Sequence, residues 1–292
     1  MRFAPTALVL SALLLAACPQ ADPEPDAGSG NDDATVADAS SADVNQATLQ
    51  EQEPNNGATV DEFDALPLDT TMLGALQQSE DVDIFRFDAV PGQLYEVTLT
   101  PAAGSSLQPH LTVMDPGDAT SASGDDYVKI VRAPQGAVAI ELFAMGHSSY
   151  FVVVRDARNV GGAGGAGGID HGYELIVSAR APSDAASGTI VFPATEQGAL
   201  DHAGAIALYD FEGTLWTDVL FDLQASGDMD GRLFIYSAEE QDWIARNDNR
   251  ALGDPDPLID APLTADGAMF LVVENIEEQA TSLGYTLAAS LP

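Results

Sequence analysis

The chain of 292 residues is poor in cysteine and in positive charge. Its single cysteine, Cys18, leaves no partner for an intrachain disulfide. Lysine and arginine together number 10 against 46 aspartates and glutamates, and Lys129 is the only lysine. The resulting formal charge of −36 makes nucleic acid and anionic membrane surfaces poor partners, so we expect no nucleic-acid binding.

Helical periodicity and catalytic motifs are also lacking. No apolar pattern at helical spacing runs beyond one or two turns, which argues against an α/β fold. The four histidines show no zinc-ligand spacing, and the sequence contains no His-Glu-x-x-His motif. The segment from Gly146 to Tyr150 departs from the Gly-x-Ser-x-Gly motif of serine hydrolases. We therefore expect a protein that is not an enzyme.

The N-terminus has the pattern of a secretory signal. Arg2 precedes an apolar run from Ala7 to Leu15 that is too short to span a bilayer as a helix. The sequence Leu-Ala-Ala-Cys that ends at Cys18 resembles the lipobox of bacterial lipoproteins. This resemblance implies that residues 1–17 are removed and that Cys18 is acylated. The alternative is an ordinary signal peptide that happens to contain one cysteine.

Two further features bear on location. Pro19 stands where aspartate would signal retention in the inner membrane of enteric bacteria, so we expect an outer-membrane or cell-surface location. Residues 19–50 are rich in Pro, Ala, Ser, Gly and Asp and contain no aromatic or basic residue. Such a segment cannot bury a core, and we therefore interpret residues 18–50 as a disordered acidic tether that begins at the lipidated cysteine.

The rest of the chain contains an internal repeat. The sequence Gly-Ala-Leu at Gly74 recurs 124 residues later at Gly198, and the apolar segments that follow each copy keep the same spacing. From Tyr95 to Thr100 apolar residues occupy every second position, as expected for a strand with one face toward a core. The repeat and the alternation predict an all-β protein of two tandem antiparallel β-sandwiches of the jelly-roll kind, at residues 51–186 and 187–292.

The first copy contains a distinctive series of segments, namely Glu51-Gln52-Glu53-Pro54-Asn55-Asn56, Gly74, Asp81-Val82-Asp83-Ile84-Phe85-Arg86-Phe87, Gly92, Tyr150-Phe151-Val152-Val153-Val154 and Tyr173-Glu174-Leu175. Together these segments resemble the bacterial pre-peptidase C-terminal domain, a β-sandwich module found beside secreted peptidases and on surface proteins. The second copy looks like a divergent member of this family, because it has Ala207 where the first copy has Asp83.

The resemblance also implies a calcium site in the first copy. The collagen-binding domains of clostridial collagenases are similar modules, and there a Glu-x-Glu-x-Asn-Asp segment joins two acids to hold calcium. Asp83 lies two and four residues before Phe85 and Phe87, hence on the core-facing side of its strand, where a carboxylate is costly without a cation. The alternative is a solvated acidic turn. The implied ligands are Glu51, Glu53, Asn55, Asn56, Glu80 and Asp83.

Trp216 is a second candidate for binding. In the repeat it falls opposite Gly92, at a hairpin tip, where a large aromatic ring could stack on a sugar or a protein partner. The alternative is that the ring folds back over the edge of the sandwich or over the neighbouring domain.

These observations predict a non-catalytic, lipid-anchored surface protein used for binding or adhesion, with an extracellular protein or polysaccharide as partner. Calcium should stabilise its first sandwich. The alternative function is that of an accessory to a secreted peptidase, as a chaperone or as a substrate-docking subunit.

Overall fold

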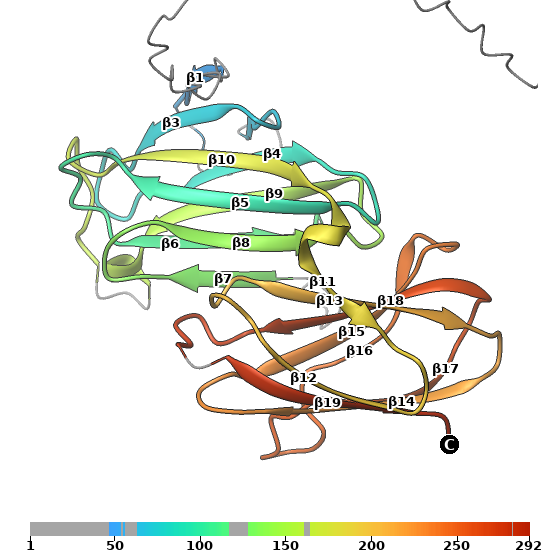
Figure 1. Cartoon of the computed structure of the whole chain (residues 1–292). Coiled ribbons are helices and arrows are strands. Elements are labelled where there is room, and N and C mark those ends of the chain that lie inside the picture. The colour runs from blue at the N-terminus through green and yellow to red at the C-terminus, as the bar shows by residue number, and fades with distance from the viewer. Residues whose placement is uncertain (1–46, 54, 56–62, 117–127, 161–163, 282) are drawn as a thin grey trace, which may run out of the picture. The chain divides into compact units, whose positions relative to one another are not determined.

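The computed structural model describes residues 47–53, 55, 63–116, 128–160, 164–281 and 283–292. The predicted signal peptide, Cys18, the tether as far as residue 46, and Asn56 lie outside these residues. In the described part, β-strands are joined by turns and by two short 3₁₀ helices, and no α-helix is present. Nor does this part contain a helix with the length and apolar character needed to cross a membrane. The predicted all-β class is confirmed (Figure 1).

The first sandwich consists of two five-stranded sheets, ordered β1-β3-β10-β5-β8 and β2-β4-β9-β6-β7. From β3 to β10 the strands are shared between the sheets as in an eight-stranded jelly roll, whereas β1 and β2 are additions that run parallel to β3 and β4. The elements are β1 Thr48–Gln50, β2 Asp64–Ala65, β3 Thr71–Ala75, β4 Asp83–Asp88, β5 Leu94–Pro101, β6 Pro109–Met114, β7 Val128–Arg132, β8 Val138–Phe143, β9 Ser149–Asp156, η1 Ala157–Asn159 and β10 Gly172–Arg180.

The second sandwich repeats this arrangement. Its sheets have the orders β12-β19-β14-β17 and β11-β13-β18-β15-β16, which is the same jelly roll with β11 added parallel to β13. The elements are η2 Pro182–Ala185, β11 Ala186–Thr189, β12 Ala194–Ala199, β13 Ile206–Gly213, β14 Asp218–Ala225, β15 Gly231–Ser237, β16 Asp242–Asn247, β17 Leu258–Pro262, β18 Gly267–Asn275 and β19 Gly284–Ser290.

The sequence repeat coincides with the structural repeat. β14 begins and ends 124 residues after β5, and β12 and β13 lie at the positions that the same shift gives for β3 and β4. Two tandem β-sandwiches are therefore present, as predicted. One difference concerns the predicted tether, because its residues Thr48–Gln50 form β1. These exposed residues pair with β3 through the backbone, and the Gln50 side-chain amide also donates to Leu73 O at 3.0 Å, so the pairing needs no apolar side chain.

Each sandwich has a core between its sheets. In the first sandwich, Phe85 and Phe87 of β4 face Val97 and Leu99 of β5 from the opposite sheet, and all four side chains are buried. The alternating strands place every second side chain in this core. Each such side chain contributes roughly 1.5–3 kcal/mol through burial. Equivalent positions in the second sandwich, among them Phe221 and Leu223, form its own core.

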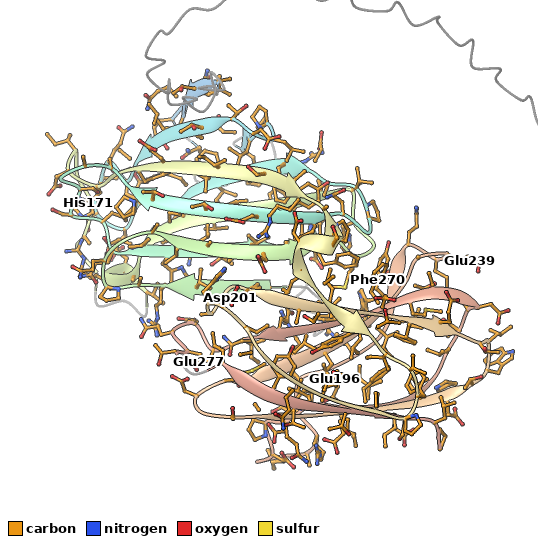
Figure 2. All side chains as sticks on the ribbon, viewed as in Figure 1. His171, Glu196, Asp201, Glu239, Phe270 and Glu277 are labelled. Carbon is orange, nitrogen blue, oxygen red and sulfur yellow. The ribbon has the colours of Figure 1, made fainter. Side chains whose placement is uncertain are left out.

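Residues 45–292 form one compact unit, and the outer face of the β13-β18-β15 sheet is buried in it. The Phe143 ring of the first sandwich lies 5.0 Å from the Tyr236 ring and 5.5 Å from the Phe270 ring of the second, centroid to centroid (Figure 2 labels Phe270). Ile206 and Phe234 join the same apolar cluster. This sheet of the second sandwich is therefore buried on both faces. The alternating pattern seen in the first copy predicts a sheet with only one buried face.

The only lysine of the chain lies in this contact. Lys129 Nζ of β7 lies 3.2 Å from Glu274 Oε2 of β18, and both side chains are at most 1% exposed. The ammonium also donates to the backbone oxygens of Ala205, at 3.1 Å, and Glu141, at 3.4 Å. Arg232 pairs with the same Glu274 carboxylate at 2.5 Å. Removing Lys129 would leave Glu274 buried with Arg232 as its remaining cation, so this ion-pair network contributes to the contact between the sandwiches.

Candidate metal centre in the first sandwich

Asp83 lies at the start of β4 with its side chain in the interior. It shares a strand face with Phe85 and Phe87, as the alternation predicts, and it is 0% exposed. A carboxylate in this position has lost its water and needs hydrogen-bond donors or a cation in exchange. Asp83 Oδ2 accepts from the Tyr173 hydroxyl at 2.5 Å.

Glu51 brings a second carboxylate to the same hydroxyl. Its Oε1 accepts from the Ala75 backbone N–H at 2.6 Å, and its Oε2 lies 3.0 Å from the Tyr173 hydroxyl. Gly74 makes room for this arrangement, because a Cβ there would come within 2.4 Å of the Tyr173 hydroxyl oxygen. A tyrosine hydroxyl carries one proton and can donate to only one of the two carboxylates. The other carboxylate depends on further donors, which Glu51 has in the Ala75 N–H and the Asn55 amide, or on a proton or a cation.

Asn55 adds a third oxygen to the group. Its side chain is fully buried, and its amide oxygen faces two acceptors, with Asp83 Oδ1 at 2.9 Å and Glu53 Oε2 at 3.3 Å. Rotating the amide by half a turn would make its nitrogen a donor to both. A cation among the three oxygens would hold the amide as it stands, because carbonyl and carboxylate oxygens are the ligands of hard cations.

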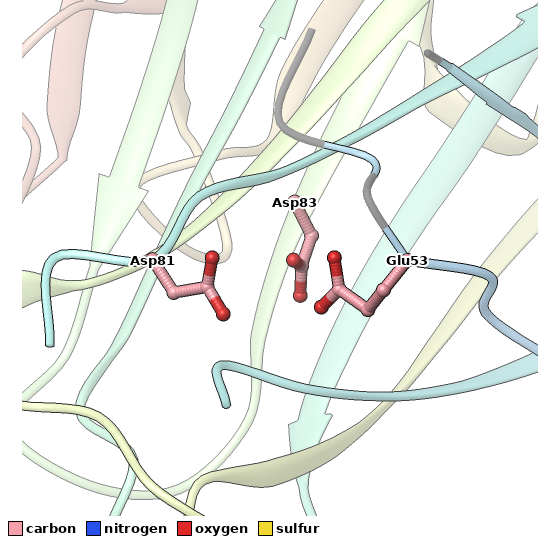
Figure 3. A group of neighbouring side chains, drawn as sticks. All are labelled: Glu53, Asp81 and Asp83. Carbon is pink, nitrogen blue, oxygen red and sulfur yellow. The ribbon is translucent and has the colours of Figure 1, made fainter. Parts of the chain in front are cut away.

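Glu53, Asp81 and Asp83 complete the cluster. Each offers one carboxylate oxygen, and these oxygens all lie within 4.8 Å of one another. Figure 3 shows the three side chains converging from the entrance segment and from the approach to β4. Asp81 Oδ2 also accepts from the backbone N–H of Gln77 at 2.7 Å, which fixes the loop before the strand. Four carboxylates, counting Glu51, therefore gather where two separate segments meet.

The charges of this cluster oppose one another. Burial, the nearby Glu51 carboxylate and the other acids raise the pKa of Asp83 to about 9. The pKa values of Glu51 and Glu53 are also raised, in both cases first by burial. No lysine or arginine among the described residues forms an ion pair with these groups. A divalent cation would favour their ionised forms and lower all of these pKa values.

The three clustered acids differ from the predicted ligand set. They add Asp81 and include neither Glu80 nor Glu51, although Glu51 shares the Tyr173 hydroxyl with Asp83. Glu80 has a φ of 65°, and its carboxylate reaches toward Gly164, whose Cβ would lie 3.0 Å from Glu80 Oε1. Alternation could have identified Asp81, because it lies two residues before Asp83 and four before Phe85, in the same period of two.

Among the described residues of the second sandwich, no such cluster is found. Ala207 of β13, which is buried, occupies the position of Asp83. The glycine–tyrosine pair is kept, since a Cβ on Gly198 would come within 2.4 Å of the Tyr285 hydroxyl oxygen. That hydroxyl, however, lies 2.9 Å from another hydroxyl, that of Tyr209, where Tyr173 has carboxylates. The chain thus contains two copies of the same fold, one with the acidic site and one without it.

Trp216 lies in the turn between β13 and β14, and its side chain is 73% exposed. It is far along the chain from the acidic cluster and belongs to the other sandwich.

No family model and no curated protein matches the chain. Among solved structures, similarity is found to the pre-peptidase C-terminal domain of a collagenase from Bacillus anthracis, with 13% identity, a TM-score of 0.31, and coverage of 36% of this chain and 94% of that one. A periplasmic inhibitor of g-type lysozyme from Aeromonas hydrophila has 16% identity, a TM-score of 0.27, and coverage of 37% and 97%.

A longer stretch of the chain is similar to the secreted serine protease VesC from Vibrio cholerae, with 11% identity and a TM-score of 0.27. That similarity covers 74% of this chain and 51% of the protease. All three scores lie below 0.5, so the β-sandwich fold rests on the strand order and register of the chain itself. Membership of the pre-peptidase C-terminal family stays a prediction.

Proposed function

We propose that the chain is a non-catalytic, lipid-anchored protein of the bacterial outer membrane or cell surface, whose tandem sandwiches bind an extracellular protein or polysaccharide. Cys18 is the point of lipid attachment, and the acidic tether separates the sandwiches from the membrane. Calcium binds to the first sandwich through Glu53, Asp81 and Asp83 and stabilises its fold.

The observation that carries the calcium proposal is the gathering of four carboxylates, two of which share the Tyr173 hydroxyl as a donor. Tyr173 can satisfy either Glu51 or Asp83, and Glu53 and Asp81 add negative charge within the same cluster. Such a group is stable at neutral pH only if it keeps protons or holds a cation.

The donor set fits calcium. Ca²⁺ takes six to eight oxygen ligands, among them carboxylates, amide and backbone carbonyls, and waters. The three clustered carboxylates and the Asn55 amide oxygen are of these kinds, and they come from two segments that are separate in sequence. A bound ion would link residues 51–55 to the start of β4. It would thereby hold the entrance of the chain against the sandwich.

A calcium-dependent melting experiment tests this proposal. The mature chain is melted in chelator and in calcium, and a hundredfold excess over Kd should add about 2.7 kcal/mol to the free energy of unfolding. Glu53→Gln should weaken this response, because it removes an exposed ligand and leaves the buried groups in place. Asp88→Asn is the matched control, because it removes a carboxylate that is 89% exposed from the other end of β4.

Two results would contradict the calcium site. An equal response in both variants would mean that calcium only screens an acidic surface. The absence of any response in the unsubstituted chain would mean that the cluster keeps protons instead of a cation.

A further inference from the structure

The turn that carries Trp216 has a backbone conformation that suits glycine. Trp216 has a φ of 64°, in the left-handed region that residues with a Cβ adopt at a cost. The equivalent residue of the first sandwich is Gly92, with a φ of 78°. Both turns close in the same way, because Gly92 N–H donates to Ala144 O at 2.8 Å and Trp216 N–H donates to Leu263 O at 2.9 Å. The repeat has kept the turn and replaced its glycine by tryptophan.

The conformation of this turn does not depend on the indole. The Leu215 N–H donates to Asp266 Oδ1 at 2.8 Å, and the Thr217 N–H donates to Thr214 O at 3.0 Å. The ring itself remains 73% exposed, so it gains little from the core. Non-glycine residues in this region of backbone space gather at ligand-binding sites, where the surrounding structure holds them. The position of Trp216 therefore points to contact with something outside the chain.

The surroundings of the turn carry negative charge only. Neither residues 206–226 nor residues 251–292, which supply β13, β14 and the facing β17–β18 loop, contain a lysine or an arginine. Asp218 follows the turn and is exposed, and Asp266 lies in the facing loop. Glu240 is held to that loop by the Thr264 hydroxyl, at 3.3 Å. An indole face among carboxylates attracts a cation through both its quadrupole and the local field.

The chain already uses this chemistry internally. Arg246 places its guanidinium carbon 5.2 Å from the centroid of the Trp243 ring, the other tryptophan of the chain. No described lysine or arginine lies over Trp216 in the same way. A cationic side chain over the Trp216 ring would therefore come from a partner.

We propose that the Trp216 turn binds a basic segment of a partner protein, with an arginine or lysine side chain over the indole and the carboxylates of Asp218 and Asp266 facing its charge. This inference rests on the proposed binding function and names the chemistry of its partner. It does not depend on the calcium site. A neutral sugar would also stack on the ring, but it would gain nothing from the excess of negative charge.

The test uses the mature chain and calorimetric titration with a short amidated oligoarginine peptide. An oligoglutamate peptide and a neutral cello-oligosaccharide are titrated in parallel. Trp216→Gly removes the ring and suits the backbone, so the variant should fold, and it should bind oligoarginine at least about fivefold more weakly. In a Trp243→Phe background, oligoarginine should also change the emission of Trp216, and added salt should reduce the effect.

A pair of charge variants locates the site. Asp218→Asn should weaken oligoarginine binding, whereas Asp201→Asn, which removes an exposed carboxylate elsewhere in the second sandwich, should leave it unchanged. Equal affinity for the unsubstituted chain and for Trp216→Gly would overturn the inference, because the peptide would then bind to acidic surface in general. Binding of the oligosaccharide that depends on Trp216, without such binding of oligoarginine, would overturn it in favour of a sugar site.

The two proposals can fail separately. Trp216→Gly should keep the full calcium response in melting, because the acidic cluster lies in the first sandwich. If Trp216→Gly binds oligoarginine as tightly as the unsubstituted chain does, this inference fails. The proposed function would still stand as long as the calcium response and the surface location are intact.

Discussion

Replacing Asp83 by asparagine should stabilise the metal-free chain and abolish its response to calcium. The carboxylate is 0% exposed and shares the Tyr173 hydroxyl with Glu51. In Asp83→Asn the amide oxygen can still accept from Tyr173. The new amide nitrogen would take the place of Oδ1, 2.9 Å from the Asn55 amide oxygen, where it finds an acceptor. The substitution thus keeps the shape, removes a buried charge and supplies the missing donor.

The expected gain follows from the pKa of Asp83, which burial and the neighbouring acids raise from 3.8 to about 9. In the absence of metal the folded chain keeps a proton at pH 7 that the unfolded chain releases. Keeping it costs on the order of 4 kcal/mol, at 1.36 kcal/mol for each pH unit above the ordinary value. Asp83→Asn removes this cost. For a unit of this size, such a gain corresponds to a rise in Tm of roughly 10 °C.

The same pKa fixes the direction of the pH dependence. In chelator, the stability that Asp83 contributes is fully present below about pH 4, where both states hold the proton, and falls as the pH rises toward 9. Asp83→Asn should flatten this part of the curve. With calcium, the unsubstituted chain should lose less stability over the same range, because the ion favours the carboxylate.

Differential scanning calorimetry in chelator and in calcium, from pH 5 to pH 8, measures all three effects. A metal-free Asp83→Asn variant that melts below the unsubstituted chain would refute the reasoning, because it would show that the ionised carboxylate stabilises the fold. A calcium response that survives in the variant would show that Asp83 is not a ligand.

Three further predictions concern other parts of the chain. Cys18→Ala should move the protein from the membrane fraction to the soluble fraction, and the intact mass of the unsubstituted protein should show a triacylated N-terminus; a soluble protein with a free thiol would contradict this. Trp216→Gly should raise the free energy of unfolding by about 1 kcal/mol in urea titrations, because it relieves the left-handed backbone at φ 64°; lower stability would mean that the ring packs on the sandwich. Lys129→Met should cost about 1–3 kcal/mol, because it removes a buried donor and leaves Glu274 with Arg232 as its remaining ion-pair partner. Arg86→Met, at the exposed pair with Asp88, is the control and should cost less than about 1 kcal/mol. Equal losses of unfolding free energy in the two variants would show that the buried pair contributes no more to stability than the exposed one.

The fold could be predicted from the sequence because the duplication and the alternation act locally. A strand shows its core face by a period of two, and the shift from Gly74 to Gly198 carried that assignment from one copy to the other. The family resemblance implies Asp83 as a ligand, and the same period of two places it on the core-facing side of its strand. Asp81 follows the same period of two but lies before the strand. Its position near the site depends on the loop at Gln77, whose backbone N–H donates to the Asp81 carboxylate.

The contact between the sandwiches could not be predicted from alternation, because the second copy does not alternate there. Successive apolar residues such as Phe234, Ile235 and Tyr236 indicate a strand buried on both faces, but not what covers the second face. The covering residues, Phe143 among them, lie far away in sequence. The buried position of Lys129 likewise depends on Glu274, a long-range partner that no local pattern reveals.

The most direct test of the account is a calorimetric titration of the metal-free mature chain with calcium at pH 7, in two buffers of different ionisation enthalpy. One binding site should appear, it should be absent in Asp83→Asn, and its heat should differ between the buffers because calcium displaces the proton that Asp83 holds. Several weak sites with no dependence on buffer, or no binding at all, would contradict the calcium centre and leave the cluster as a protonated acidic turn.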